Sequence, residues 1–326
     1  MLTSNGTSPA TAMIDRVHGV DERAAYPADK PMSPAMRLVL AFVAGNAFAA
    51  AAFLMLFPAG GAQFFWHVTP PISAGMVGAL YLAAAVPVAY AAIGGVWEPA
   101  RYLAPMVMVF AALMLLATFR HLHKFDSGPK LTYWLAVYVV ALVAGVVFYY
   151  QHERGGADWA VTGGPTPQAV RAIALVAGLL AAAFAVAGSV APDRVAALWP
   201  WALTPLTTLV FLAWVGAFAA GLLWVAYDPD RRRTRPVAYL LVGVAALLAA
   251  TLVAHRGDLH PDPAGIGAFC VGVAGIGLLG AFMLLFDRRR VSGQAPLRAG
   301  EPSAPRDDDA LAPYLSVSDV SEVSHG

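Results

Sequence analysis

Polar side chains that could bind a metal ion or take part in acid–base chemistry gather in short segments of an otherwise apolar chain. Residues 120–130 read RHLHKFDSGPK, and residues 255–263 read HRGDLHPDP. Histidine nitrogens and carboxylate oxygens are ligands that zinc, copper and iron bind in proteins. Together with two tryptophan-containing loops, these segments supply the candidate site residues, which are Trp66, His67, His121, His123, Asp126, Trp201, His255, Arg256, Asp258 and His260.

The spacing of these residues leaves several kinds of site open. In a helix His121 and His123 would point to nearly opposite faces, so they could share one ion only on extended backbone. The sequence has no HExxH motif, which would indicate a zinc site. Arg120, Lys124 and Arg256 could instead bind the phosphate of a lipid headgroup. A third interpretation is that these are solvated loop residues, and the sequence identifies no cofactor or metal.

The composition indicates the kind of protein that must position these residues. Hydrophobic residues make up 59% of the 326 residues and charged residues 13%, whereas soluble domains have about 25% charged residues. The chain is therefore expected to be a multi-pass membrane protein. Its 21 basic and 20 acidic residues give no net charge that would favour nucleic-acid binding. With Cys270 as its single cysteine, the chain can form neither an intrachain disulfide nor a thiolate metal cluster.

Eight apolar windows are long enough to cross a bilayer, which takes about 20 residues. The predicted spans are Met36 to Phe57, Ile72 to Val96, Tyr102 to Phe119, Leu131 to Tyr150, Arg171 to Val190, Pro205 to Tyr227, Val237 to Ala254 and Gly265 to Phe286. An even number of spans places both termini on one side. Residues 1–35 and 288–326 are polar and are predicted to be disordered tails.

The basic residues predict the orientation of these spans. If the termini face the cytoplasm, the inner segments hold sixteen Lys and Arg residues and the outer loops hold five. Cytoplasmic loops carry the excess of Lys and Arg, so both termini are predicted to be cytoplasmic. Arg outnumbers Lys eighteen to three and Ala is frequent, which is typical of a GC-rich bacterium and suggests a bacterial plasma membrane.

A repeated phrase suggests internal duplication. FFWHVTPPIS (residues 64–73) and LWPWALTPLT (residues 198–207) superpose without a gap when Trp66 is placed on Trp201, and the two Thr-Pro pairs then coincide. The proline suits the first turn of a helix, the threonine before it can act as a cap, and the tryptophans are expected at the headgroup level. We therefore expect an all-α fold of two parallel four-helix repeats, residues 36–150 and 171–287, joined by a cytoplasmic linker, residues 151–170.

The predicted spans lack an ionisable residue near their centres. Such a residue would mark an ion or proton pathway, so its absence argues against a proton-coupled transporter, a voltage sensor and a haem held between facing helices. Asn46 is the most polar candidate inside a span, and an interhelical hydrogen bond would account for it.

The phrase aromatic-x-Trp-x-[Val/Leu]-Thr-Pro, the histidine at the end of the third span and the Trp134-Leu135-x-x-Tyr138 start of the fourth resemble multi-pass membrane proteins of actinobacteria and related bacteria. The resemblance covers about residues 36–287. It brings no established activity, cofactor or site residue with it.

Two classes of function follow from these patterns. The parallel repeat and the absence of a catalytic motif favour a non-enzymatic membrane protein whose outward-facing cavity binds or moves a small apolar or amphipathic molecule. The tryptophan loops would wall that cavity, and its partners would be the bilayer and a lipid-like ligand. The alternative is a membrane enzyme or redox subunit that uses the outer His and Asp residues with a metal, haem or lipid phosphate.

Overall fold

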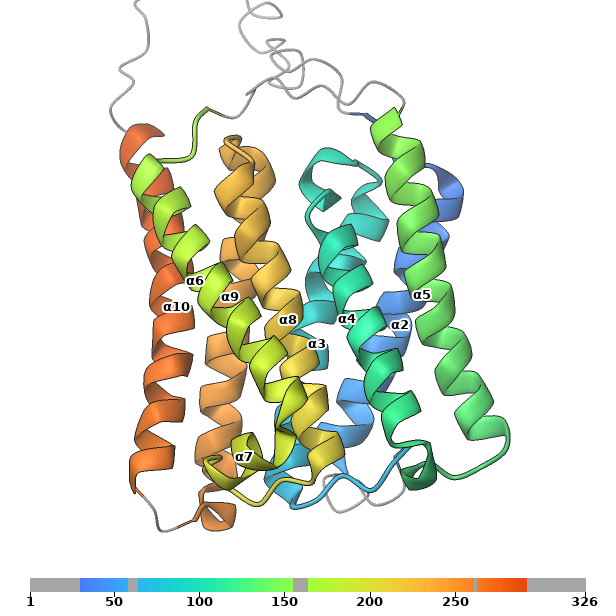
Figure 1. The fold of residues 1–326 in the computed structure, drawn as a ribbon. Helices are drawn as coiled ribbons and strands as arrows, with labels where there is room; N and C mark the ends of the chain where they lie inside the picture. Colours follow the sequence, from blue (N-terminus) through green and yellow to red (C-terminus); the bar gives the residue numbers. More distant parts are fainter. Residues whose placement is uncertain (1–29, 58–63, 155–163, 261–262, 292–326) are drawn as a thin grey trace, which may run out of the picture. The chain divides into compact units, whose positions relative to one another are not determined.

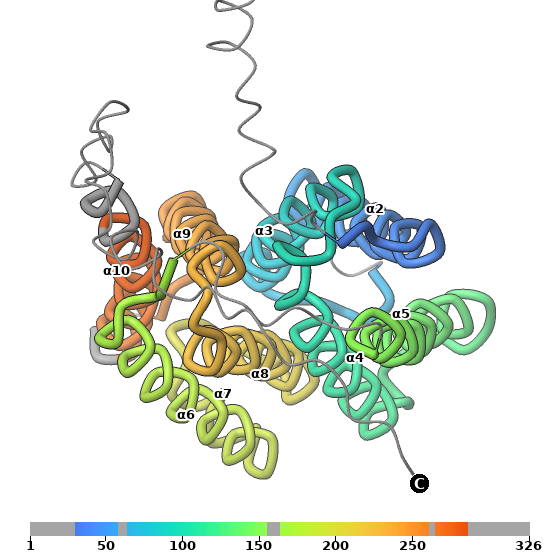
Figure 2. Tube along the Cα trace, turned by 90° about the horizontal axis from the view of Figure 1, so that it is seen from above, coloured from blue at the N-terminus to red at the C-terminus, as the bar shows by residue number. Residues whose placement is uncertain are grey.

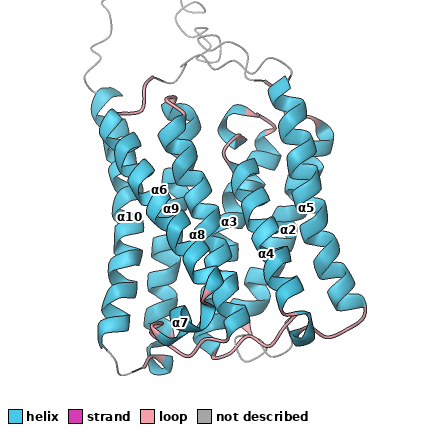
Figure 3. Cartoon of the chain, viewed as in Figure 1, coloured by secondary structure: helices cyan, strands magenta, loops and turns pink. Residues whose placement is uncertain are grey.

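A computed structural model describes residues 30–57, 64–154, 164–260 and 263–291. Among these residues, eight helices are long and apolar enough to cross a membrane, which confirms the predicted spans and indicates a multi-pass membrane protein. Of the predicted tails, residues 1–35 and 288–326, most lie outside the described residues (Figure 3), but residues 34–35 begin a helix and residues 288–291 end one. Residues before Arg288 form one compact unit, and the description below concerns that unit.

The elements follow one another as antiparallel helices joined by short connections (Figure 1). The long helices are α2 (Pro34–Leu56), α3 (Pro71–Gly94), α4 (Leu103–Arg120), α5 (Pro129–Arg154), α6 (Gln168–Val190), α8 (Pro205–Tyr227), α9 (Arg231–Ala254) and α10 (Pro263–Val291). The short elements are η3 (Glu98–Ala100), η4 (Leu122–Lys124), α7 (Pro192–Ala197) and η5 (Arg256–Asp258).

The helices form an inner and an outer group (Figure 2). α3, α4 and α8 are the most buried, α9 is less so, and α2, α5, α6 and α10 have the smallest share of buried residues. α2 packs along α3, and α6 packs along α8. The inner helices then pair crosswise, α4 with α8 and α3 with α9. Each outer helix can therefore face lipid, whose tails accept apolar side chains on every exposed face.

Matching arginines satisfy the carbonyl groups at the ends of α3 and α8. Arg37 donates from Nε to the carbonyl oxygen of Ala92 at 2.9 Å and from Nη2 to that of Ile93 at 3.2 Å. In the second half of the chain, Arg171 makes the same bonds to Ala226 (2.9 Å) and Tyr227 (3.3 Å). The last carbonyls of a helix have no partner within the helix, and a cation there also interacts favourably with the helix dipole.

The start of α3 differs from the prediction by one residue. α8 begins at Pro205 with Thr204 as its cap, as expected, and Thr204 Oγ1 accepts from the Thr207 amide at 3.2 Å. α3 begins at Pro71 rather than at the proline before it, so the preceding threonine is not its cap. The Asp258 carboxylate accepts from the Ile72 amide at 2.9 Å instead. The sequence separation between the first residues of α3 and α8 is therefore one residue shorter than the separation between Trp66 and Trp201.

Trp66 and Trp201 are buried inside the protein, so neither ring has the wet side that an interfacial anchor would have. Their exposed fractions are 3% and 0%. Both rings lie in aromatic clusters, where Trp66 contacts Trp134 with ring centroids 5.3 Å apart and Trp201 contacts Phe269 at the same distance. A buried indole is stabilised by packing against other rings and by a hydrogen-bond partner for its N–H.

Candidate functional site

A cavity of about 350 Å³ lies among the first helices of the chain. Residues of α2, α3, α4 and α5 form most of its wall, and α8 and α9 close it with Trp214, Ala217, Phe218 and Leu240. Phe64 and Phe65, from the connection between α2 and α3, line it as well. The volume is at the lower end of the range for small-molecule pockets, about 300 to 1,000 Å³. The cavity can therefore hold a small molecule but not a whole phospholipid.

The cavity reaches the surface of the bundle between α2 and α5. These helices contact each other over a short stretch only. Ala49 of α2 and Tyr133 of α5 both line the cavity, and both are exposed. Because this surface belongs to apolar helices of membrane-spanning length, a molecule dissolved in lipid could enter the cavity sideways.

A hydrogen bond joins the helices on either side of this opening. The Tyr133 hydroxyl donates to the side-chain oxygen of Asn46 at 2.5 Å, and the Asn46 amide donates to the Phe42 carbonyl at 2.8 Å. The expectation that Asn46 makes an interhelical hydrogen bond is therefore confirmed. The bond therefore spans the opening between α2 and α5.

The depth of the cavity holds a second polar pair. The hydroxyl groups of Tyr81 and Tyr138 lie 2.6 Å apart, and either one can be the donor. Tyr81 is in the middle of α3, about 15 Å along the axis from its first residue. Trp214 packs against Tyr81 with ring centroids 5.3 Å apart. Its indole nitrogen is buried without a hydrogen-bond partner among the described residues.

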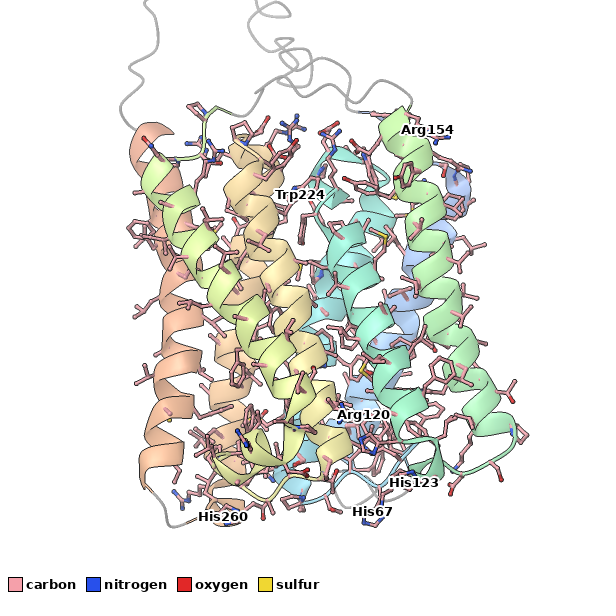
Figure 4. All side chains as sticks on the ribbon, viewed as in Figure 1. His67, Arg120, His123, Arg154, Trp224 and His260 are labelled. Atoms are coloured by element: carbon pink, nitrogen blue, oxygen red, sulfur yellow. The ribbon has the colours of Figure 1, made fainter. Side chains whose placement is uncertain are left out.

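The labelled histidines lie at one end of the helices, opposite the end that carries Arg154 (Figure 4). We refer to these as the histidine end, with His67, His123 and His260, and the Arg154 end. At the histidine end, His255 Nδ1 lies 3.8 Å from the Asp258 carboxylate, and that carboxylate also caps α3.

The remaining candidates do not form a compact site. The side chains of His67, His123, Asp126, Arg256 and His260 are exposed. Among the described residues, no group of three or more His, Cys, Asp or Glu could hold a metal ion. The two loop tryptophans do not line the cavity, although the phenylalanines of the first loop do. A site at the histidine end therefore stays a prediction.

His121 has a perturbed pKa at the histidine end. Burial lowers the pKa of His121 from its ordinary value, and the charges of Arg120, His123 and Lys124 lower it further, while Asp193 opposes them. His121 Nε2 is buried and has no hydrogen-bond partner among the described residues. A proton on this imidazole would therefore be poorly stabilised.

The Arg154 end contains a buried charge network that sequence reasoning missed. Arg101, which is fully buried, donates to Glu153 from Nε at 2.7 Å and from Nη2 at 2.8 Å. Glu98 accepts from Arg101 and from Arg233, each at 3.4 Å. Glu98 thus connects the segment after α3 to the start of α9.

Arg233 lies in the arginine-rich first turns of α9 and is one of the basic residues that were counted for the predicted orientation. Its side chain is buried rather than solvated, with an exposed fraction of 2%, and its Nε donates to Asp228 at 2.7 Å. Asp228 and Asp230 are themselves buried. The nearby acidic residues are the signal that could have identified the network. Basic residues that serve only to set the orientation in a membrane do not need acidic partners.

Comparisons with protein families, curated proteins and solved structures found no match for this chain. The class of protein therefore rests on the fold, which is that of a multi-pass α-helical membrane protein.

Proposed function

We propose that this protein binds or moves a small apolar or amphipathic molecule in the cavity bounded by α2, α3, α4 and α5. The observation that carries the proposal is a cavity of about 350 Å³ with mainly apolar walls and an opening between α2 and α5. An apolar cavity that faces lipid favours ligands that already dissolve in lipid, because polar molecules would lose their hydration there.

The proposed architecture is a duplicated four-helix unit in which one copy keeps the cavity. Arg37 and Arg171 make the same contact, and the offset in the chain that relates them also relates the first residues of two pairs of helices, Pro71 to Pro205 and Pro129 to Pro263. The crosswise pairing of α3 with α9 and α4 with α8 also fits two related halves. Both observations support halves of the same orientation, related by an axis along the membrane normal.

The hydroxyl and amide groups that line the cavity come from the first half of the chain. At the offset that relates the two arginines, the counterparts of Asn46, Tyr81, Tyr133 and Tyr138 are, in that order, Leu180, Val215, Gly267 and Gly272. The difference favours a binding site built mainly from the first half, to which α8 of the second half adds Trp214.

The proposed orientation places the histidine end outside a bacterial plasma membrane and both termini in the cytoplasm. Its support is the excess of Lys and Arg in the segments that flank the Arg154 end. The end of the cavity that Phe64 and Phe65 line would then lie toward the outer leaflet.

Photolabelling of the full chain in lipid nanodiscs tests the proposed cavity. The probe is dodecane that carries a diazirine, which has no polar group and therefore tests the cavity alone. We expect labelled peptides from α2 and α5 and competition by excess dodecane. Ala47→Phe fills the cavity and should abolish the competed labelling. Ala181→Phe, at the matching position of α6, should leave it intact. Equal labelling of all lipid-facing helices, unchanged in Ala47→Phe, would contradict the proposal.

A further inference from the structure

The cavity holds an unusual set of polar groups at mid-depth. Tyr81, Tyr138 and Trp214 all line it and come from three different helices. Their exposed fractions are 6%, 6% and 5%. Groups buried this deeply usually have all their hydrogen-bonding capacity satisfied, because a buried donor without a partner destabilises the fold.

The tyrosine pair leaves one donor unused. The hydrogen bond between the two hydroxyls takes up one O–H donor and one oxygen acceptor. Each hydroxyl has one donor, so the second O–H has no partner within the pair. The indole N–H of Trp214 also lacks a partner among the described residues.

Other polar groups of the cavity are already engaged. The indole of Trp134 donates to Thr118 at 3.0 Å, and Tyr133 donates to Asn46. Lys130 is the charged residue among those that line the cavity, and it lies at the outer start of α5 with its side chain 57% exposed. An exposed charge of this kind contributes little to binding.

We infer that the ligand is an uncharged apolar molecule with one hydrogen-bond-accepting oxygen, such as a ketone, ester or ether, which is bound at Tyr81, Tyr138 and Trp214. This inference rests on the proposed function and specifies the chemistry of its ligand. The donors supply the recognition, because an acceptor oxygen satisfies them and a bare hydrocarbon does not. An ionised head is disfavoured at this depth, since no opposite charge lines the cavity there.

Substitution by phenylalanine removes the donors with little change in shape. Tyr81→Phe or Tyr138→Phe alone would leave the other hydroxyl buried without a partner, so the double variant is the cleaner test. Trp214→Phe removes an N–H that has no protein partner among the described residues, so any loss of ligand recognition cannot come from a broken hydrogen bond within that part of the chain. Matched controls are Tyr90→Phe, which is on the exposed face of α3, and Trp199→Phe, whose indole N–H is also unpartnered there but lies outside the cavity.

The experiment measures competition against the diazirine-dodecane probe by dodecane, 2-dodecanone and dodecanoate. In the wild-type chain we expect 2-dodecanone to compete best. Its advantage over dodecane should fall about five- to tenfold in the double tyrosine variant and in Trp214→Phe, the effect of one lost hydrogen bond. The advantage should persist in Tyr90→Phe and Trp199→Phe. The ratio of competition by 2-dodecanone to competition by dodecane is compared between variants, so that differences in how each compound partitions into the bilayer cancel.

The outcomes separate the ligand chemistry from the cavity itself. If 2-dodecanone and dodecane compete equally, or if the ketone advantage survives the tyrosine and Trp214 substitutions, the inferred recognition is wrong although the cavity stands. Strongest competition by dodecanoate, lost in Lys130→Ala, would place an anionic head at the mouth and also overturn the inference. If no compound displaces the probe and Ala47→Phe changes nothing, the proposed function fails with it.

Discussion

The indole nitrogen of Trp201 donates a hydrogen bond of 2.9 Å to the hydroxyl oxygen of Ser73, which joins the loop before α8 to the first turn of α3. Trp66 makes the converse contact, from the loop before α3 to Thr207 in the first turn of α8, at 3.5 Å. Ser73 and Thr207 are both the third residue of their helices. The tryptophan of each half is thus held by the other half at the histidine end.

The shorter of these contacts should contribute more to stability. Trp201→Phe leaves the fully buried Ser73 hydroxyl without its donor, and we expect a loss of about 1 to 3 kcal/mol. In Trp66→Phe the loss of stability from the broken hydrogen bond should be smaller than in Trp201→Phe, because a bond of 3.5 Å is long and weak. The measurement is the midpoint of unfolding in detergent.

A double-mutant cycle isolates the Trp201–Ser73 contact. Trp201→Phe combined with Ser73→Ala should be less destabilised than the sum of the single variants, with a coupling of about 1 kcal/mol. Strict additivity would show that the hydrogen bond contributes nothing.

The network at the Arg154 end should be the most sensitive electrostatic feature. Arg101→Ala leaves Glu153 with an uncompensated charge and should destabilise the protein by about 3 to 5 kcal/mol. Lys130→Ala is the matched control, because its pair with Asp126 is exposed and long at 3.9 Å, so its loss should cost less than about 1 kcal/mol. Equal effects in thermal unfolding would contradict the assignment of Arg101 to a buried network.

Acidification should weaken the histidine end through His121. The folded protein lowers the pKa of this imidazole, so the unfolded chain binds a proton more readily. The stability that depends on neutral His121 is complete above its ordinary pKa of about 6.5 and is lost as the pH falls below it. We expect a smaller pH dependence of the unfolding midpoint in His121→Gln than in the wild type or in His123→Gln. An unchanged dependence in His121→Gln would rule out this histidine as the source.

The orientation can be tested with single cysteines in a Cys270→Ser background. Ser127→Cys lies at the histidine end and Arg154→Cys at the opposite end, and both positions are exposed. In intact cells, a membrane-impermeant maleimide should label Ser127→Cys at once and Arg154→Cys only after permeabilisation. The reverse labelling pattern would contradict the proposed orientation.

Sequence patterns predicted the membrane class and the spans because both depend on length and hydropathy, which are local properties. The cavity could not be predicted in this way. Tyr81 and Tyr138 are far apart in the sequence and meet only in the folded bundle, and a tyrosine inside a span does not stand out in a search for ionisable residues.

Burial was the other property that the sequence did not reveal. An interfacial tryptophan and a buried one have the same flanking residues, and the packing of loops such as that of Trp66 decides between them. Similarly, the sequence alone places Arg233 among the basic residues that indicate membrane orientation. Only the folded structure shows its ion pairs with Asp228 and Glu98.

The most direct test of the central claim is the binding stoichiometry of 2-dodecanone to the purified full chain, measured by equilibrium dialysis in nanodiscs against empty nanodiscs. We expect about one molecule per chain above the bilayer background, lost in Ala47→Phe and retained in Ala181→Phe. Binding that does not exceed the empty-nanodisc background, or that is equal in Ala47→Phe and Ala181→Phe, would contradict a ligand site between α2 and α5.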